Sequence, residues 1–320
     1  MRASTPKAWV LRSPAAPERA QELAVQLGIS HTFATLLANR GFCSSSDVQS
    51  FLEPNLDKLL DAFTMRDMDL AAARIWKAID ERESILVYGD YDVDGITATS
   101  LLTAALQRLG GKVSYFIPDR IRDGYGFSVR GVDVAKKRRI RLVITADCGI
   151  TATTEVKLAK QHGIDVIVTD HHEPLGVLPE AHAVVNPKRR DCPYEFKELA
   201  GVGVVLKLVQ GLAQYRPGSL PADFVYDHLD LVALGTIADV VPLRGENRIF
   251  AKLGLEAFGE VGDPFDPAIH EAVMHAESDE VSEPTSTTVS SGLIRIEVYS
   301  TNEFRIFEGI LGSASQLPEP

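Results

Sequence analysis

The sequence is poor in cysteine and has no long apolar run. Only three cysteines occur among 320 residues, at Cys43, Cys148 and Cys192, and they lie far apart. So few cysteines exclude a disulfide scaffold and a cysteine-rich zinc module, and they favour a reducing, cytoplasmic compartment. No apolar run approaches the ~18 residues that span a bilayer. Residues 1–20 also lack the apolar stretch of a secretory signal, so we expect neither a membrane span nor a leader.

Positive charge is also scarce. The chain has 33 basic and 44 acidic residues, which leaves a net charge of −11. A chain with this net charge does not bind a polyanion through its overall charge. Binding would have to come from a local basic patch or from a metal. The remaining composition, 45% hydrophobic and 24% charged residues, is typical of a globular protein with one large domain or two modest ones.

The sequence pattern changes twice along the chain, in apolar periodicity near residue 84 and in composition after residue 258, and predicts three parts, residues 1–83, 84–258 and 259–320. The first part is helical, because its apolar residues recur at helical spacing. The predicted helices cover residues 20–28, 31–39, 46–52 and 70–81. We therefore expect a small helical layer that leads into the second part.

In the second part, short apolar runs alternate with helical patterns. The predicted strands cover residues 85–88, 113–117, 142–146, 166–169 and 183–185. The predicted helices cover residues 96–109, 129–138, 154–162, 199–214 and 224–238. This alternation is typical of βαβ units, so we predict an α/β fold with a doubly wound, mostly parallel sheet.

Acidic residues follow the apolar runs of this second part. The acids and their neighbours are Asp90, Asp92 and Asp94, then Asp147, then Asp170 with His171 and His172, and finally Asp239. Because the carboxyl ends of parallel strands meet at one edge of a sheet, we expect these side chains to share a crevice.

So many carboxylates in one crevice need a compensating charge. Two unit charges about 4 Å apart repel by roughly 4 kcal/mol at an effective dielectric near 20. Several such repulsions would exceed the free energy that stabilises a typical domain. Divalent cations remove this cost, and mixed Asp and His ligands suit manganese, with magnesium or zinc as alternatives. The pattern therefore predicts a site for two metal ions, of the kind that supports phosphoryl chemistry.

Each element of this pattern also has a simpler interpretation. The run that starts at Asp90 matches the beginning of an EF-hand loop, but its twelfth position is Leu101 and the run follows a strand. A single acid after a strand is often the cap of the next helix, and His171 and His172 alone could be a solvated pair. The joint occurrence of all these residues favours the metal site.

Four segments resemble motifs I to IV of the DHH phosphoesterase superfamily. They are residues 87–95 (VYGDYDVDG), 145–149 (TADCG), 169–172 (TDHH) and 235–243 (GTIADVVPL). Within the superfamily, residues 8–258 are most similar to the RecJ family. These bacterial exonucleases hydrolyse single-stranded DNA in the 5′-to-3′ direction during DNA repair and recombination. The resemblance thus implies a nuclease whose partners are single-stranded DNA and repair or replication proteins.

The resemblance also implies roles for the residues. The ligands of two Mn²⁺ or Mg²⁺ ions would be Asp90, Asp92, Asp94, Asp147, His171 and Asp239. Asp147 would be shared between the ions, and Asp147, His171 and His172 would form the catalytic group. His172 either ligates or contacts the scissile phosphate, and both roles stay open. Asp170 would orient a histidine from outside the ligand set.

Basic and aromatic residues of the same edge are candidates for substrate binding. Arg120 and Arg122 follow a strand into this edge, and we expect them to contact phosphate. Tyr125 could stack on a base or simply pack its loop. The basic run 188–190 follows the last strand, so a contact with the nucleic acid backbone is open there too.

The third part departs from the family. Between residues 256 and 283 there are nine acidic residues and no Lys or Arg, and residues 282–292 are mainly Ser and Thr. This composition predicts an irregular, poorly ordered tail with one strand at 294–299. Residues 255–285 resemble a fragment of GrpE, the nucleotide-exchange factor of the DnaK chaperone.

RecJ-like proteins instead continue into a second domain and an OB-type domain, and the second domain closes the cleft. We therefore expect a truncated chain of weak activity. Two other functions are weighed against it: a DHH phosphodiesterase of short oligonucleotides or cyclic dinucleotides, and a non-catalytic DHH interaction module.

Overall fold

The computed structural model describes residues 17–121, 124–261, 287–291, 294–299 and 303–308. The chain divides into two compact units, one up to Leu56 and one from Asp57 onward. Within the described ranges, no helix combines the length and the hydropathy that a membrane crossing needs.

The first unit contains three short helices around a small apolar core. They are α1 (Pro17–Leu27), α2 (His31–Asn39) and α3 (Ser45–Leu52). The hydroxyls of Ser30 and Ser44 cap α2 and α3, since each accepts a hydrogen bond from a backbone N–H of the first turn. Leu23, Leu37 and Val48 are buried between the helices. The predicted positions of these three helices are confirmed to within three residues.

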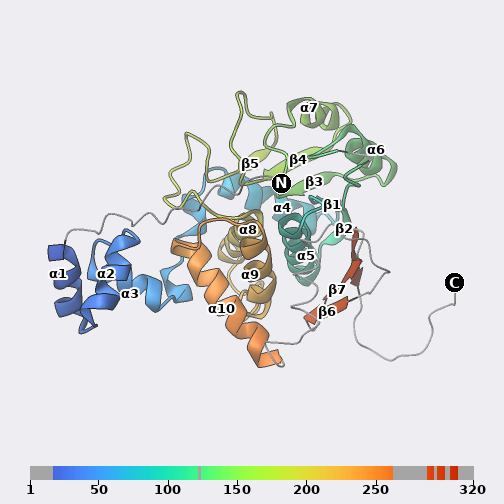
Figure 1. The fold of residues 1–320 in the computed structure, drawn as a ribbon. Helices are drawn as coiled ribbons and strands as arrows, with labels where there is room; N and C mark the ends of the chain where they lie inside the picture. Colours follow the sequence, from blue (N-terminus) through green and yellow to red (C-terminus); the bar gives the residue numbers. More distant parts are fainter. Residues whose placement is uncertain (1–16, 122–123, 262–286, 292–293, 300–302, 309–320) are drawn as a thin grey trace, which may run out of the picture. The chain divides into compact units, whose positions relative to one another are not determined.

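The second unit contains a five-stranded parallel sheet (Figure 1). The strands are β1 (Ser84–Tyr88), β2 (Lys112–Phe116), β3 (Leu142–Ala146), β4 (Asp165–Thr169) and β5 (Ala183–Val185), in the order β2-β1-β3-β4-β5. The three central strands, β1, β3 and β4, are buried almost throughout. This explains why they are continuous runs of Val, Ile and Leu rather than alternating patterns.

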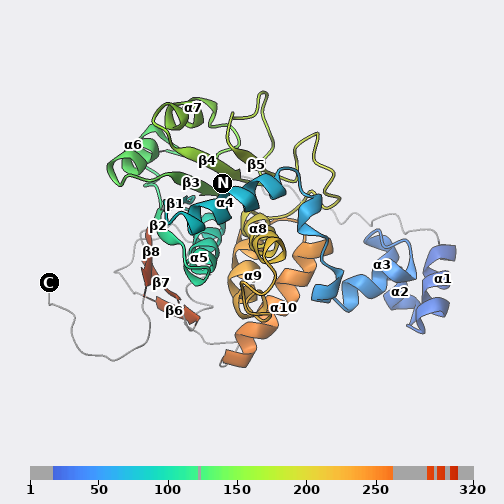
Figure 2. The same cartoon turned by 180° about the vertical axis from the view of Figure 1, so that it is seen from behind.

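Helices cover both faces of this sheet, and the last two of them pack against other helices. They are α4 (Met68–Asp80), α5 (Val93–Arg108), α6 (Val129–Lys137), α7 (Thr153–Gln161), α8 (Gly201–Tyr215), α9 (Leu229–Ala238) and α10 (Gly245–Val261). Three 3-10 turns accompany them, at Leu56–Lys58, Ala62–Thr64 and Tyr226–His228. Figures 1 and 2 show α6 and α7 on one face, and α4, α5 and α8 on the other. The predicted α/β, doubly wound class is therefore confirmed.

Two helix boundaries differ from the prediction for local reasons. Helix α5 starts at Val93, three residues early, because the Asp92 carboxylate accepts a hydrogen bond from Gly95 N at 2.9 Å and caps the helix. Helix α9 starts at Leu229, five residues late. There the buried His228 ring donates from Nδ1 to Phe224 O at 2.8 Å, which holds a 3-10 turn in place of the first helical turn.

The predicted tail contains more regular structure than expected. Strands β6 (Thr287–Ser291), β7 (Ile294–Tyr299) and β8 (Glu303–Glu308) form an antiparallel sheet in that order. The strand at 294–299 is thus present, but part of the expected linker over 282–292 pairs with it as β6. Helix α10 runs to Val261, past the predicted boundary at 258. The GrpE-like segment beyond residue 261 lies outside the described residues.

Candidate metal centre

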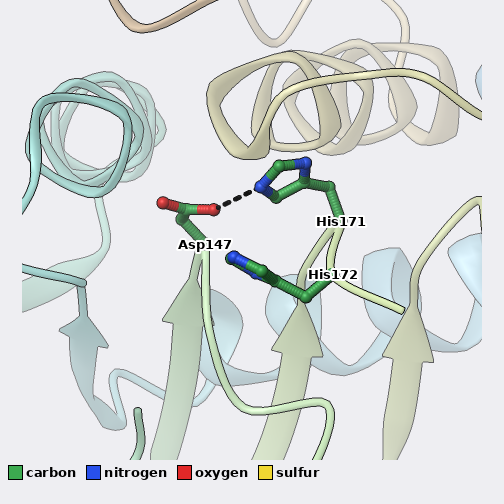
Figure 3. Close-up of side chains that lie close together, drawn as sticks. All are labelled: Asp147, His171 and His172. Atoms are coloured by element: carbon green, nitrogen blue, oxygen red, sulfur yellow. Dashed lines mark ion pairs between the residues drawn. The ribbon is translucent and has the colours of Figure 1, made fainter. Parts of the chain in front are cut away.

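The carboxyl ends of β1, β3 and β4 lie in register at one edge of the sheet. Tyr88 pairs with Thr145, and Ala146 pairs with Thr169. The residues that follow these strands therefore emerge side by side, and Figure 3 shows Asp147, His171 and His172 beyond the strand tips. This is the edge at which open α/β sheets bind ligands.

His171 stands among three carboxylates that come from different elements. Its Nε2 lies 3.2 Å from Asp147 Oδ1 (Figure 3), 3.6 Å from Asp239 Oδ2 and 3.9 Å from Asp94 Oδ2. Asp239 is the C-cap of α9, and Asp94 lies in the first turn of α5. Four segments spread over about half of the chain thus meet at one imidazole.

The donor atoms form three overlapping sets, and within each set they lie within 4.8 Å of one another. The sets are Asp90 with Asp92 and Asp147, Asp94 with His171 and Asp239, and Asp147 with His171 and His172. Asp147 and His171 each belong to two sets. This arrangement can hold two cations with one carboxylate between them, and it contains every residue of the ligand set that the resemblance implies.

Asp147 adopts a backbone conformation that few residues other than glycine accept. Its φ is +66°, which costs an L-residue roughly 1–2 kcal/mol. Two threonines hold this turn. The Thr145 hydroxyl donates to Cys148 O at 2.7 Å, and the Thr169 hydroxyl donates to Thr145 O at 2.6 Å. Asp147 N donates to Thr169 O at 3.1 Å, so the strained turn is bonded on both sides.

Asp94 is held by the N-terminus of α8. Gly201 N donates to its Oδ2 at 2.6 Å, and Val202 N donates to its Oδ1 at 2.8 Å. The N-cap residue Ala200 offers no side-chain cap, so Asp94 satisfies the helix start from another element, where the helix dipole favours negative charge. A Cβ on Gly201 would lie only 2.3 Å from Asp147 Oδ1. Glycine is therefore required at that position.

Burial and mutual repulsion disfavour ionisation of these carboxyls. Burial raises the pKa of Asp90 to about 6 and that of Asp94 to about 7. Burial, with the charge of Asp94 next in importance, raises the pKa of Asp147 well above its ordinary value. For His171, burial and then the charge of His172 lower the pKa to about 4, so its imidazole is neutral near pH 7.

Two buried residues of the cluster show what it lacks. Among the described residues, Asp147 Oδ1 and both ring nitrogens of His171 find no hydrogen-bond partner. Leaving such a buried group unpaired costs about 1–3 kcal/mol. A divalent cation would satisfy Asp147 Oδ1 and one imidazole nitrogen, and it would offset the repulsion between the carboxylates. Carboxylate oxygens with neutral imidazole also make a donor set that suits Mn²⁺ or Mg²⁺, so the residues fit the metals that the resemblance implies.

Asp170 holds the histidine pair in place. Its Oδ1 accepts from His172 Nδ1 at 2.8 Å and from His171 N at 2.7 Å, and its Oδ2 accepts from Ile150 N at 2.8 Å. Burial opposes ionisation of Asp170, but the His172 hydrogen bond and charge hold its pKa below the ordinary value. The Tyr125 hydroxyl lies 3.1 Å from both nitrogens of His172.

The predicted substrate-binding residues lie in different settings. Tyr125 contacts His172 and is about half exposed. Arg120 is exposed, and its guanidinium lies 5.3 Å from the centre of the Tyr91 ring, next to Asp90 in sequence. Arg122 lies outside the described residues.

The sequence assigned no role to the residues that support this cluster. They are Thr145, Thr169, Gly201 and the buried Asn186, whose Nδ2 donates to His172 O at 2.9 Å. The one available signal was the position of both threonines just before Asp147 and Asp170. Nothing local marks Gly201 or Asn186, because their partners are distant in sequence or are backbone atoms.

The comparison with known families agrees with this geometry. Residues 84–236 match the family described as DHH family, N-terminal domain. The particular resemblance is to RecJ. The chain is 46% identical over 248 residues to the single-stranded-DNA-specific exonuclease RecJ of Bacillus subtilis (strain 168), which covers 78% of this chain and 30% of that protein.

A second relative is RecJ of Escherichia coli (strain K12), which is 40% identical over 230 residues, with 69% of this chain and 39% of that protein covered. The chain thus spans 30–39% of the length of these curated relatives. The resemblance to RecJ is confirmed.

Solved structures give the same result. A crystal structure of exonuclease RecJ bound to manganese has a TM-score of 0.56 and 38% identity, and covers 62% of this chain and 49% of its own. RecJ from Thermus thermophilus in complex with Mn²⁺ has a TM-score of 0.63 and 33% identity, and covers 76% of this chain and 34% of its own.

Proposed function

We propose that this chain is the catalytic part of a metal-dependent nuclease that hydrolyses phosphodiester bonds of single-stranded DNA from the 5′ end. The observation that carries this proposal is the set of overlapping donor groups around Asp147 and His171. Support comes from relatives that are named single-stranded-DNA-specific exonucleases and from RecJ structures that contain Mn²⁺ or Mg²⁺.

In this proposal six side chains hold two divalent cations, Mn²⁺ or Mg²⁺. They are Asp90, Asp92, Asp94, Asp147, His171 and Asp239. Asp147 would serve both ions, because it shares one donor set with Asp90 and another with His171. When bound, the two cations supply Lewis acidity toward water and toward the phosphoryl group.

His172 contacts the scissile phosphate in this proposal. Its Nδ1 is bonded to Asp170, so Nε2, which lies 3.1 Å from the Tyr125 hydroxyl, is the nitrogen proposed to turn to the substrate in place of that contact. The Tyr125 hydroxyl limits rotation of the ring, and Asp170 acts as its positioning residue. Arg120 and Tyr125 bind the strand at a backbone phosphate and at a base, and Arg122 is proposed for the same role on the sequence alone.

The relatives extend beyond the region that this chain matches, so the activity of the chain by itself is proposed to be weak. A role in DNA repair and recombination, repair or replication proteins as partners and a cytoplasmic location also remain proposals. The division at residues 83 and 258 remains a prediction, although α4, which lies before residue 84, packs in the sheet-containing unit through a Trp76 Nε1 hydrogen bond to Leu212 O.

The test uses a 5′-labelled single-stranded oligonucleotide, the matching duplex and a dinucleotide, each with Mn²⁺ or with EDTA. We expect Mn²⁺-dependent release of mononucleotide from the 5′ end of the single strand, and little from the duplex. Cleavage of the dinucleotide only would instead indicate a phosphodiesterase of short oligonucleotides. If calorimetry shows no Mn²⁺ binding near micromolar concentration, the chain is a non-catalytic module.

A further inference from the structure

Three consecutive basic residues follow β5, and the structure separates their roles. Arg189 is 8% exposed and forms ion pairs with Asp67 at 2.6 Å and with Asp191 at 2.8 Å. Its cation is therefore used inside the fold. Lys188, in contrast, forms no ion pair within the part of the chain that the structure describes, although it is half-buried. Arg190 is exposed.

The backbone places Lys188 beside the metal centre. Val185 pairs with Thr169, so the chain leaves β5 at the same edge as the histidine pair. Asn186 is fully buried and joins the two segments. Its Nδ2 donates to His172 O at 2.9 Å, and its Oδ1 accepts from Lys188 N at 2.8 Å. Lys188 is thus two hydrogen bonds away from His172.

The charge of Lys188 acts on the centre itself. Its positive charge is felt at both His171 and Asp239, where burial and the charges of other residues have the larger effects. The amino group therefore lies within electrostatic reach of two of the residues that surround the candidate site, on the side where α9 ends at Asp239.

The centre needs a cation in that place. Its donor sets contain five carboxylates, Asp90, Asp92, Asp94, Asp147 and Asp239. Two divalent ions carry four positive charges, so an approaching phosphate would still meet an excess of negative charge. An ammonium at the rim would correct this balance and would donate hydrogen bonds to phosphate oxygens as a compact charge.

We propose that Lys188 binds a non-bridging phosphate oxygen of the nucleic acid substrate at the metal centre. This inference rests on the proposed nuclease function and adds a substrate-contacting residue to it. It also assigns different roles to neighbours of the same charge, because Arg189 supports the fold while Lys188 serves the substrate.

The experiment compares Lys188→Gln with Lys188→Arg and with the matched control Lys160→Gln. Lys160 lies in the last turn of α7, is exposed, and pairs with Glu180 at 3.7 Å. The control thus removes the same charge from a different part of the domain. Three quantities are measured on the full chain: kcat/KM for a 5′-labelled single strand, Mn²⁺ affinity by calorimetry, and anisotropy of a fluorescent oligonucleotide with non-hydrolysable phosphonate linkages.

For Lys188→Gln we expect kcat/KM and oligonucleotide affinity to fall about 10- to 100-fold, the loss of one charged hydrogen bond. We expect Mn²⁺ affinity to stay equal or to rise a few-fold, because a repelling charge is gone. Lys188→Arg should restore most of the loss, and Lys160→Gln should change each quantity less than about twofold. A purely structural lysine would instead lower activity and metal affinity together.

The proposal is overturned if Lys188→Gln matches Lys160→Gln in oligonucleotide affinity, or if its Mn²⁺ affinity falls in parallel with activity. Failure of the proposed function looks different, because the unmodified chain would then bind Mn²⁺ and the phosphonate oligonucleotide without cutting any substrate. In that case the anisotropy comparison alone decides the role of Lys188.

Discussion

Asp147 joins three properties at a single residue. It is fully buried, it has a positive φ, and one of its oxygens is without a hydrogen-bond partner among the described residues. Each property destabilises the chain in the absence of a ligand. Asp147 also belongs to two of the donor sets. The same residue therefore favours cation binding and destabilises the fold when no cation is bound.

We expect Asp147→Ala to abolish metal-dependent hydrolysis while the fold survives. The substitution removes a donor from both candidate cation positions, but it also removes a buried like charge from beside Asp94. Activity on a labelled single strand and Mn²⁺ calorimetry measure the first effect, and circular dichroism measures the second. Activity that persists with an unchanged spectrum would count against the two-metal assignment.

Thr145 provides a second test at the scale of one residue. Thr145→Val keeps the shape of the side chain but leaves the buried Cys148 carbonyl without its 2.7 Å hydrogen bond. We expect the turn at Asp147 to loosen and Mn²⁺ affinity to fall roughly 10-fold or more, as for other residues that orient ligands. The control is Thr145→Ser, which retains the hydroxyl and should bind Mn²⁺ like the unmodified chain. If the two variants bind Mn²⁺ with equal affinity, the Thr145 hydroxyl does not help to hold the metal site.

At the scale of elements, α8 connects the metal centre to the interior of its unit. Its N-terminus bonds Asp94, and its middle carries Lys207, which is fully buried. Lys207 Nζ donates to Glu246 Oε1 at 3.1 Å and to Leu60 O at 2.5 Å. Glu246, at the start of α10, also accepts from Leu60 N and from the Tyr194 hydroxyl. This network fastens α8, α10 and the segment before α4 to one another.

We expect Lys207→Met to lower the free energy of unfolding by about 3–5 kcal/mol, because it leaves Glu246 buried without its cation. Chemical denaturation measures this loss. The matched control is Lys252→Met in α10, since Lys252 pairs with Glu256 on the surface and such pairs contribute at most about 1 kcal/mol. If both variants lower the free energy of unfolding by a similar amount, the buried network stabilises the fold no more than a surface ion pair does.

At the scale of the whole molecule, acidic residues outnumber basic ones, and five of the acidic side chains are gathered at one edge of the sheet. The net charge is −11, and burial raises the pKa of four of the clustered carboxyls. The folded state therefore carries a repulsion that cations relieve. Binding and folding stability are coupled for this reason.

We expect Mn²⁺ to raise the thermal midpoint of the chain. A free concentration of about 100 times Kd stabilises the folded state by about 2.7 kcal/mol, or roughly 5–10 °C for a unit of this size. Differential scanning fluorimetry with Mn²⁺ and with EDTA measures the shift, and Asp147→Ala serves as the control with a much smaller one. Equal shifts in the two proteins would place the stabilising cation elsewhere.

Prediction from sequence succeeded where the determining interactions are local. The strand at 142–146 was predicted at its observed bounds, because a short apolar run rich in β-branched residues is typical of a buried parallel strand and is too short for a helix. The start of α9 was misplaced, because the His228 ring redirects the backbone there. The collection of Asp90, Asp147 and His171 at one edge also followed from the sequence, since strand direction alone determines that edge.

The sequence by itself determined the alternation of strands and helices and the acidic residues that follow the strands. These acidic residues in turn indicated divalent cations as the ligands. Only the tertiary structure decided that Gly201 must stand against Asp147, that α8 bonds Asp94, and that Lys188 and Arg189 have different neighbours. The physical reason is distance along the chain. Asp94 and Gly201 are 107 residues apart, and such pairs depend on how whole elements pack rather than on any local pattern.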